Sequence, residues 1–257
     1  MYKLFKRTHR PGTFEVQMAA ACDPGISRDH NEDAVYISNH EEHGYYLAIV
    51  CDGMGGHNAG EIASAIAVET IAQSIAEQFT SFDPESLLEN AFHKASARID
   101  EQAIINPEAK GMGCTCVMVL GIQGMLYVAH SGDSRAYRVR DGQISPLTSD
   151  HTMVQEMVEN GLITEEQAAV HPYRGRISRC LGHGKNKGEP TVRACDFLPG
   201  DNILLCSDGL SDVVKKEELQ LLMGQRDVRS CCRRLIDAAN AKGGPDNIST
   251  ILLRRLV

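Results

Sequence analysis

Short apolar runs and two longer helical patterns divide the first hundred residues of this chain. The apolar run 45–51 follows the run 34–38 across a polar turn, which is typical of a β-hairpin. Apolar residues then recur at helical spacing over residues 60–79, and Pro84 stands where a second helix begins. With a further strand expected at 13–20, this part of the chain is predicted to form three strands followed by two helices.

The rest of the chain is predicted to alternate between short strands and helices. Asp141-Gly142 tolerates the positive φ that a type I′ hairpin turn needs. We expect the strands on both sides of this turn to form one antiparallel meander, at 113–121, 125–131, 135–140 and 143–147. Two short helices, at 152–161 and 164–170, form an excursion from the core. The remaining elements are predicted as strands at 191–195, 202–206 and 247–253 and helices at 216–223 and 228–241.

The composition is typical of a soluble globular protein. The 257 residues are 42% hydrophobic, enough for a large core, and the formal net charge of -8 argues against a nucleic-acid partner. No window approaches the roughly 18 apolar residues that cross a bilayer. The basic N-terminus lacks the apolar region of a secretory signal. Most of the nine cysteines lie inside apolar strands or helices, which indicates a reducing cytoplasm.

Four aspartates stand at predicted strand ends or turns beside small or turn-forming residues: Asp52, Asp133, Asp208 and Asp246. One such aspartate alone is typical of a turn or a helix cap. Four carboxylates that converge on one sheet edge would repel one another unless protons or cations neutralised them. Oxygen ligands of this kind suit Mg²⁺ or Mn²⁺, whereas zinc prefers Cys and His. The sequence therefore indicates a candidate metal site in which Asp52 enters a glycine-rich turn.

An ordered series of motifs extends this pattern over residues 23–250. The motifs are Asp23-x-Gly25-x-x-Arg28-x-x-Asn31-Glu32-Asp33, Asp52-Gly53-Met54-Gly55-Gly56-His57, Gly60-Glu61, Ser131-Gly132-Asp133-Ser134-Arg135, Leu147-Thr148-x-Asp150-His151, Cys206-Ser207-Asp208-Gly209-Leu210 and Gly244-Pro245-Asp246-Asn247. The series resembles that of the metal-dependent Ser/Thr protein phosphatases of type 2C, especially the compact bacterial members. Cys114, Cys116 and Cys180 depart from the usual bacterial pattern and are interpreted as small packed hydrophobes.

The resemblance implies an α/β (α+β) fold. This fold is a four-layer αββα sandwich, in which two antiparallel β-sheets pack face to face and helices flank each sheet. A basic tail at 1–12 precedes a single phosphatase domain at 13–257, with a small helical flap at about 151–182. Tyr173, Arg174 and Arg176 of the flap are candidates for contacts with an acidic phosphopeptide, although a solvated loop is the plainer interpretation.

The resemblance also implies a set of metal ligands. Asp52 bridges two Mn²⁺ or Mg²⁺ ions, the Gly53 carbonyl binds one of them, and Asp208 and Asp246 bind the other.

Three further acids are implied to lie around these ions. Glu32 and Asp33 act mostly through bound water. Asp133, together with Asp208, matches a third, weaker metal site of the bacterial members.

The implied reaction is direct hydrolysis of a phosphate ester. Two ions about 3.5–4 Å apart share a water and lower its pKa, so that a metal-bridging hydroxide attacks phosphorus without a covalent enzyme intermediate. Arg28 matches two phosphoryl oxygens with its guanidinium fork. His57 resembles the proposed general acid that protonates the leaving oxygen. The plainer alternatives are a surface ion pair for Arg28 and a solvent-facing side chain for His57.

The implied function is that of a protein serine/threonine phosphatase that acts on phosphoserine and phosphothreonine. Its expected partners are phosphorylated Ser/Thr proteins and a cognate bacterial Ser/Thr kinase. A cytoplasmic monomer without nucleic acid or a membrane span is expected.

Two alternative functions remain open at this point. Cys22 and Arg28 satisfy the Cys-x-x-Gly-x-x-Arg spacing of cysteine-dependent phosphatases, but Pro24 removes an N–H donor there and Asp23 brings a negative charge to the phosphate. A catalytically silent relative that binds phosphoproteins or metal would be expected to lack a ligand aspartate, and all the ligand aspartates are present.

Overall fold

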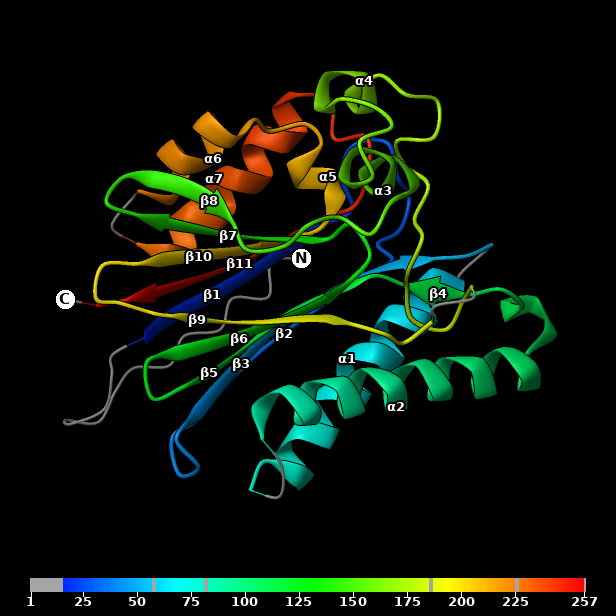
Figure 1. The fold of residues 1–257 in the computed structure, drawn as a ribbon, viewed down its shortest axis with the longest axis horizontal. Coiled ribbons are helices and arrows are strands. Elements are labelled where there is room, and N and C mark those ends of the chain that lie inside the picture. The colour runs from blue at the N-terminus through cyan, green and yellow to red at the C-terminus, as the bar shows by residue number, and fades with distance from the viewer. Residues whose placement is uncertain (1–15, 57–58, 81–82, 185–186, 225–226, 257) are drawn as a thin grey trace.

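The computed structural model describes residues 16–56, 59–80, 83–184, 187–224 and 227–256. Two β-sheets pack face to face in the middle, and helices cover the outer face of each sheet (Figure 1). The predicted four-layer αββα sandwich is therefore confirmed. The predicted tail at 1–12 lies outside the described residues.

The first sheet has five strands, in the order β1-β11-β10-β7-β8, and all neighbours are antiparallel. Its strands are β1 (Val16–Asp23), β7 (Arg135–Arg140), β8 (Gln143–Pro146), β10 (Asn202–Cys206) and β11 (Ile248–Arg255). The first and last strands of the chain pair along their full length, from Val16 opposite Arg255 to Asp23 opposite Ile248. Three helices lie on its outer face: α5 (Asp208–Ser211), α6 (Lys216–Met223) and α7 (Val228–Ala241) (Figure 1).

The second sheet has six strands, in the order β2-β3-β5-β6-β9, and a short β4 also pairs with β3. Its strands are β2 (Asp33–His40), β3 (Tyr45–Met54), β4 (Gly113–Cys114), β5 (Cys116–Ile122), β6 (Met125–Ser131) and β9 (Thr191–Asp196). The long helices α1 (Ala59–Gln78) and α2 (Pro84–Ile105) cover its outer face. The side chain of Asp83 caps α2 by accepting a hydrogen bond from the Ser86 N–H at 3.1 Å.

Apolar packing holds the four layers together in three clusters. Between the sheets, alternate residues of the central strands interdigitate, among them Val50, Val117, Leu205 and Ile251. The second sheet packs on α1 and α2 through a second cluster that includes Ala63, Ala67 and Phe92. The first sheet packs on α6 and α7 through a third, which includes Leu219, Leu235 and Ile236. The loops at the ends of the strands are thus held on a rigid support.

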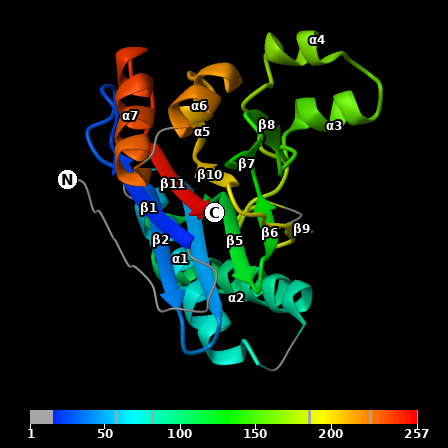
Figure 2. The same cartoon turned by 90° about the vertical axis from the view of Figure 1, so that its left-hand side faces the viewer.

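The two flap helices, α3 (Met153–Glu159) and α4 (Glu165–Ala169), stand apart from these layers (Figure 2). Thr164 and Gln167 form the predicted capping box at the start of α4. A 3-10 turn, η1 (Pro107–Ala109), follows α2. None of the described helices has both the length and the apolar content needed to cross a membrane.

The predicted single meander is wrong. β5 and β6 pair in one sheet, whereas β7 and β8 pair in the other, because the chain crosses between the sheets after Ser131. The crossing passes through Gly132, whose φ is 109°, in a region that favours glycine. Alternation of apolar residues identifies strands but does not specify their partners, so the pattern could not reveal this crossing.

Other differences from the predicted elements are local. β1 extends to Asp23, and its predicted beginning at 13–15 lies outside the described residues. The predicted strand 113–121 is interrupted at Thr115. The short α5 was not predicted, since four residues carry no helical periodicity. The predicted Asp141-Gly142 hairpin is confirmed, with positive φ at both residues, 50° and 71°.

Candidate active site

One small pocket collects most of the predicted site residues. It has a volume of about 250 Å³ and opens at the end of the sandwich where β3 ends and β10 leads into α5. Its lining residues come from seven separate stretches of the chain. They are Arg28, Glu32, Asp52, Gly53, Met54, Gly55, Thr115, Asp133, Ile177, Asp208, Asp246 and Asn247.

Thr115 holds Asp52 in place through both backbone and side chain. The Thr115 N–H donates to the Asp52 carbonyl at 2.8 Å, and the Asp52 N–H donates to Thr115 Oγ1 at 3.2 Å. Thr115 Oγ1 also lies 2.7 Å from Ser134 Oγ, in the turn that carries Asp133. The interruption between β4 and β5 therefore ties the end of β3 to the crossing between the sheets.

Gly53 occupies a position at which no side chain fits. A Cβ on this residue would collide with the Gly60 and Glu32 carbonyls. The Gly53 N–H donates to the Glu32 carbonyl at 3.2 Å. The glycine thus allows the loop before β2, the end of β3 and the beginning of α1 to meet around the pocket.

Burial and mutual repulsion raise the pKa of the carboxyl groups that line this pocket and of Asp33, whose buried carboxyl group lies beside it without lining it. Loss of hydration raises the pKa of Asp52 well above its ordinary value, and the charges of Asp33 and Asp208 raise it further. Loss of hydration also raises the pKa of Asp33 to about 7, against hydrogen bonds from two serines, and that of Asp133 to about 7. The pKa of Asp208 rises to about 6, first through desolvation and then through the charge of Asp212.

Several carboxylate oxygens in the site also lack hydrogen-bond donors. Within the described part of the chain, Glu32 Oε1, Asp33 Oδ1 and Asp208 Oδ1 are buried without a hydrogen-bond partner. A buried, unpaired acceptor is costly unless a donor or a cation compensates it. The donor set contains only oxygen, as Mg²⁺ and Mn²⁺ prefer. The residues present therefore fit the divalent cations that the sequence predicts.

The carboxylates do not form a closed metal cage by themselves. Across the described ranges, no three His, Cys, Asp or Glu side chains meet closely enough to hold an ion alone.

Among the residues that the structure describes, Arg28 is the one basic side chain that lines the pocket. Its Nη2 lies 2.9 Å from Asp246 Oδ2, and half of its side chain is exposed. A guanidinium has five N–H donors, so this pairing leaves donors available for a phosphate. His57 lies outside the described residues, and its predicted role as general acid stays a prediction.

The flap reaches the pocket through a residue that no motif marked. Ile177, which sequence reasoning missed, lines the pocket, whereas Tyr173, Arg174 and Arg176 are not among its lining residues. Arg176 instead stacks on Tyr173, with its Cζ 5.4 Å from the ring centre. Their contact with a phosphopeptide stays a prediction. No motif marked Ile177, because one apolar residue in a loop carries no signal.

The alternative Cys22 nucleophile is not placed for attack. Cys22 belongs to β1, its Sγ lies 2.9 Å from Ser249 Oγ, and it does not line the pocket that contains Arg28. The Cys-x-x-Gly-x-x-Arg spacing therefore does not create a phosphate-binding loop around a thiol here.

Comparison with known proteins extends this picture over nearly the whole chain. The family described as Protein phosphatase 2C matches residues 26–253. The serine/threonine protein phosphatase PstP of Mycobacterium tuberculosis is 38% identical over 241 residues, which cover 93% of this chain and 45% of that protein. This chain thus spans about half the length of that relative. The serine/threonine phosphatase stp of Listeria monocytogenes is 33% identical, with 91% of this chain and 93% of that protein covered.

Solved structures match a similar share of this chain. The crystal structure of Mycobacterium tuberculosis PstP/Ppp has a TM-score of 0.85 and 37% identity, covering 94% of this chain and 99% of that one. The PstP catalytic domain in complex with two manganese ions has a TM-score of 0.82 and 35% identity, with the same shares covered. The fold, the pocket and these matches lead to one conclusion: this chain belongs to the protein phosphatase 2C family.

Proposed function

We propose that this chain is a metal-dependent protein serine/threonine phosphatase that hydrolyses phosphoserine and phosphothreonine. The observation that carries the proposal is the pocket itself, where buried carboxylates without donors lie beside one arginine. Unpaired carboxylates attract divalent cations, and an arginine beside them suits a phosphate that those cations also bind.

The proposed metal ligands follow the prediction. Asp52 and the Gly53 carbonyl, with Asp208 and Asp246, hold two Mn²⁺ or Mg²⁺ ions. When bound, such ions supply a water of lowered pKa as the nucleophile and neutralise charge that develops on the phosphoryl oxygens.

The remaining proposed ligands are the other acids of the site. Glu32 and Asp33 orient bound water, and Asp133 with Asp208 forms a third, weaker site. The raised pKa of Asp33 and Asp133 supports this, since each group is costly as a bare anion where it lies.

Arg28 binds and orients the substrate phosphate. Its partner Asp246 fixes one end of the guanidinium, so the remaining N–H groups are presented to the pocket. His57, the last residue of the Asp52-Gly53-Met54-Gly55-Gly56-His57 motif, is proposed to protonate the serine or threonine oxygen as it leaves.

The proposed partners are phosphorylated Ser/Thr proteins and a cognate Ser/Thr kinase, in the cytoplasm, with the phosphatase as a monomer. The names of the relatives support the substrate class, and Mn²⁺ as the working ion is supported by the manganese-bound neighbour. A catalytically silent phosphoprotein-binding relative is the second candidate, and the complete set of aspartates disfavours it.

Turnover of a phosphothreonine peptide tests this proposal. We expect activity that requires Mn²⁺ or Mg²⁺, disappears with a chelator, survives Cys22→Ser and is lost in Asp208→Asn. Full turnover in Asp208→Asn would refute the metal mechanism. Metal binding without turnover of any phosphopeptide would favour the silent relative.

A second assay isolates the role of His57. Phenyl phosphates have leaving groups that need little protonation, whereas phosphothreonine needs a general acid. His57→Ala is therefore expected to reduce turnover of phosphothreonine far more than that of a phenyl phosphate. Equal losses on the two substrates would remove His57 as the acid.

A further inference from the structure

Asn247 makes three side-chain hydrogen bonds to a single loop, and all three go to backbone atoms. Its Oδ1 accepts from the Glu32 N–H at 2.8 Å, and its Nδ2 donates to the Pro24 and His30 carbonyls, both at 2.9 Å. Asn247 is only 6% exposed. One amide thus binds both ends of the loop 24–32, and Arg28 lies midway between those ends.

The orientation of the Asn247 amide follows from its partners. Two of them are carbonyls, which need donors, and the third is an N–H, which needs an acceptor. Only one orientation satisfies all three partners, and no other residue type of similar size offers two donors and one acceptor in this arrangement. The site therefore requires asparagine for its chemistry as well as for its volume.

Other contacts of the loop show why its position matters. The Ile26 and Ser27 N–H groups both donate to the Gly244 carbonyl, at 2.9 and 3.0 Å. Gly25 has a φ of 79°, and a Cβ there would collide with the Asp246 carbonyl. The loop is thus packed directly on the segment that carries Asp246, and Asn247 sets how the two segments meet.

We propose that Asn247 is a positioning residue for catalysis, which holds Arg28 at the correct distance from the metal-binding carboxylates. Asn247 lines the pocket but acts through the loop, because its side-chain amide is occupied by backbone groups. This inference rests on the proposed function, since it assumes that Arg28 binds the substrate phosphate. It assigns a role to the last residue of the Gly244-Pro245-Asp246-Asn247 motif.

A double-mutant cycle between Asn247 and Arg28 tests the inference. The variants are Asn247→Ala, Arg28→Ala and the double substitution, and the readouts are kcat/KM for a phosphothreonine peptide in Mn²⁺ and the inhibition constant of inorganic phosphate. A misplacement of about 1 Å can cost about 100-fold in rate, so we expect Asn247→Ala to lower kcat/KM about 100-fold. Weaker inhibition by phosphate should accompany the loss.

The decisive comparison is in the absence of the Arg28 side chain. If Asn247 acts through Arg28, adding Asn247→Ala to Arg28→Ala should cost less than about threefold further, because the interaction is already lost. Losses that multiply in full would overturn the inference, as would an Asn247→Ala variant with wild-type kcat/KM. Either result leaves the proposed function intact, provided that the wild type shows Mn²⁺-dependent turnover.

A matched control separates positioning from loss of stability. Asp201→Asn removes a buried charge far from the pocket, and it should leave kcat/KM and phosphate inhibition within about twofold of wild type below its unfolding temperature. Should Asn247→Ala not fold, Asn247→Asp keeps the volume and the acceptor for the Glu32 N–H while it removes both donors. The same double-mutant cycle, with Asn247→Asp in place of Asn247→Ala, then tests whether Asn247 acts through Arg28. If the wild type shows no Mn²⁺-dependent turnover, the proposed function fails, and phosphate binding alone still reports whether Asn247 and Arg28 are coupled.

Discussion

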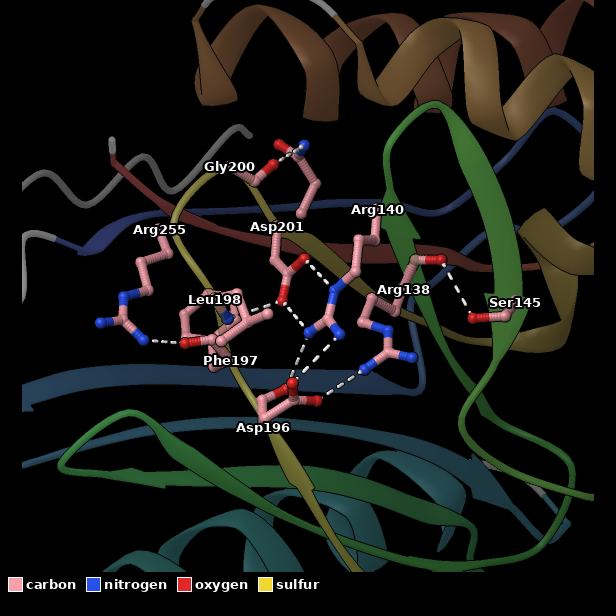
Figure 3. A network of polar contacts seen from close by, with 10 residues as sticks. Arg138, Arg140, Ser145, Asp196, Phe197, Leu198, Gly200, Asp201 and Arg255 are labelled. Atoms are coloured by element: carbon pink, nitrogen blue, oxygen red, sulfur yellow. Dashed lines mark hydrogen bonds and ion pairs between the residues drawn. The ribbon is translucent and has the colours of Figure 1, made fainter.

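The strand β10 has an aspartate near each end, and the two aspartates are treated in opposite ways. Asp201, just before the strand, is 1% exposed and receives two hydrogen bonds of 2.7 Å from Arg140 (Figure 3). Asp208, just after the strand, has an oxygen that no donor in the described structure reaches. The same residue type is thus neutralised by the protein at one end of the sandwich and left uncompensated at the other.

The neighbours of these residues follow the same division. At the Asp201 end, Arg138 and Arg140 both pair with Asp196, and the hydrogen bonds from Arg140 lower the pKa of Asp196 (Figure 3). At the Asp208 end, desolvation and neighbouring carboxylates raise the pKa of the acids. At the Asp201 end, the acids paired with arginine thus serve the fold, whereas the acids grouped with other acids at the Asp208 end cost stability and fit the proposed binding of a cation.

Among the substitutions that test this comparison, Asp52→Asn should have the largest effect. Metal ions contribute several kcal/mol to a phosphoryl-transfer transition state, so loss of the proposed bridging ligand should reduce turnover about a thousandfold. In the presence of a chelator, however, the variant should be more stable than the wild type, because a repelled carboxylate has been removed. Phosphopeptide turnover and thermal unfolding in chelator measure the two effects. A variant that loses both activity and metal-free stability would contradict the division into paired and unpaired acids.

Asp201→Asn is expected to have the reverse effects: it should lower stability and leave turnover unchanged. Removal of one partner from a buried ion pair costs about 3 kcal/mol, so the free energy of unfolding should fall by about that amount. Turnover should stay near that of the wild type, since Asp201 lies at the other end of β10. Denaturant unfolding and a peptide assay on the same sample check both points, and a loss of turnover without a loss of stability would argue against the assignment.

Binding of Mn²⁺ should stabilise the folded protein only through the acids at the Asp208 end of β10. At a free concentration 100 times the dissociation constant, a ligand that binds only the folded protein adds about 2.7 kcal/mol to the free energy of unfolding. We expect this gain in the wild type and in Asp201→Asn, and its loss in Asp208→Asn. Thermal unfolding with and without Mn²⁺ measures it, and an unchanged gain in Asp208→Asn would remove that residue as a ligand.

The metal-free protein should lose stability as the pH rises from about 4 to 7. The pKa of Asp33 and Asp133 is about 7 in the folded protein, compared with an ordinary value of 3.8. Between these values the folded protein binds more protons than the unfolded chain, so the free energy of unfolding falls with increasing pH, by up to about 4 kcal/mol for each of the two groups. Urea unfolding in chelator across this range tests it. Saturating Mn²⁺ should remove the decline, and a decline that persists unchanged in Mn²⁺ would place its origin elsewhere.

Asp196→Asn should have the smallest effect. Its side chain is 47% exposed, and ion pairs of that exposure contribute at most about 1 kcal/mol. Salt should weaken the contribution further. Unfolding in low and high salt measures the difference, and a cost as large as that of Asp201→Asn would mean that the whole network acts as one unit.

The residues of the site could be predicted from the sequence more completely than the order of the strands. Asp52, Asp208 and Asp246 each stand in a short motif whose order along the chain resembles that of the family, and the structure brings all three to one pocket. The order of the strands depends on pairings between residues up to about 240 positions apart, such as Val16 with Arg255. No local pattern contains such pairings, which is why the crossing between the sheets was missed.

Contacts made by backbone atoms were equally invisible in the sequence. The partners of Thr115 and Asn247 in the loops of the pocket are mostly backbone carbonyl and N–H groups, and every residue except proline has both groups. A side-chain pattern therefore cannot reveal such partners. Ile177 lines the pocket because the end of the flap pairs with its beginning, through one isolated antiparallel bridge between Ile177 and Thr152.

The central place of β11 has a consequence for the newly made chain. This strand is the last element in sequence, yet it lies between β1 and β10 and is preceded directly by Asp246 and Asn247. In a growing chain on the ribosome, β1 therefore has no partner strand and β10 pairs only with β7 until residues 248–255 emerge. Pairing over such long sequence separations is slow. The proposed hydrolytic activity is therefore expected only once synthesis has passed β11, and we expect a nascent chain to be inactive towards phosphoproteins.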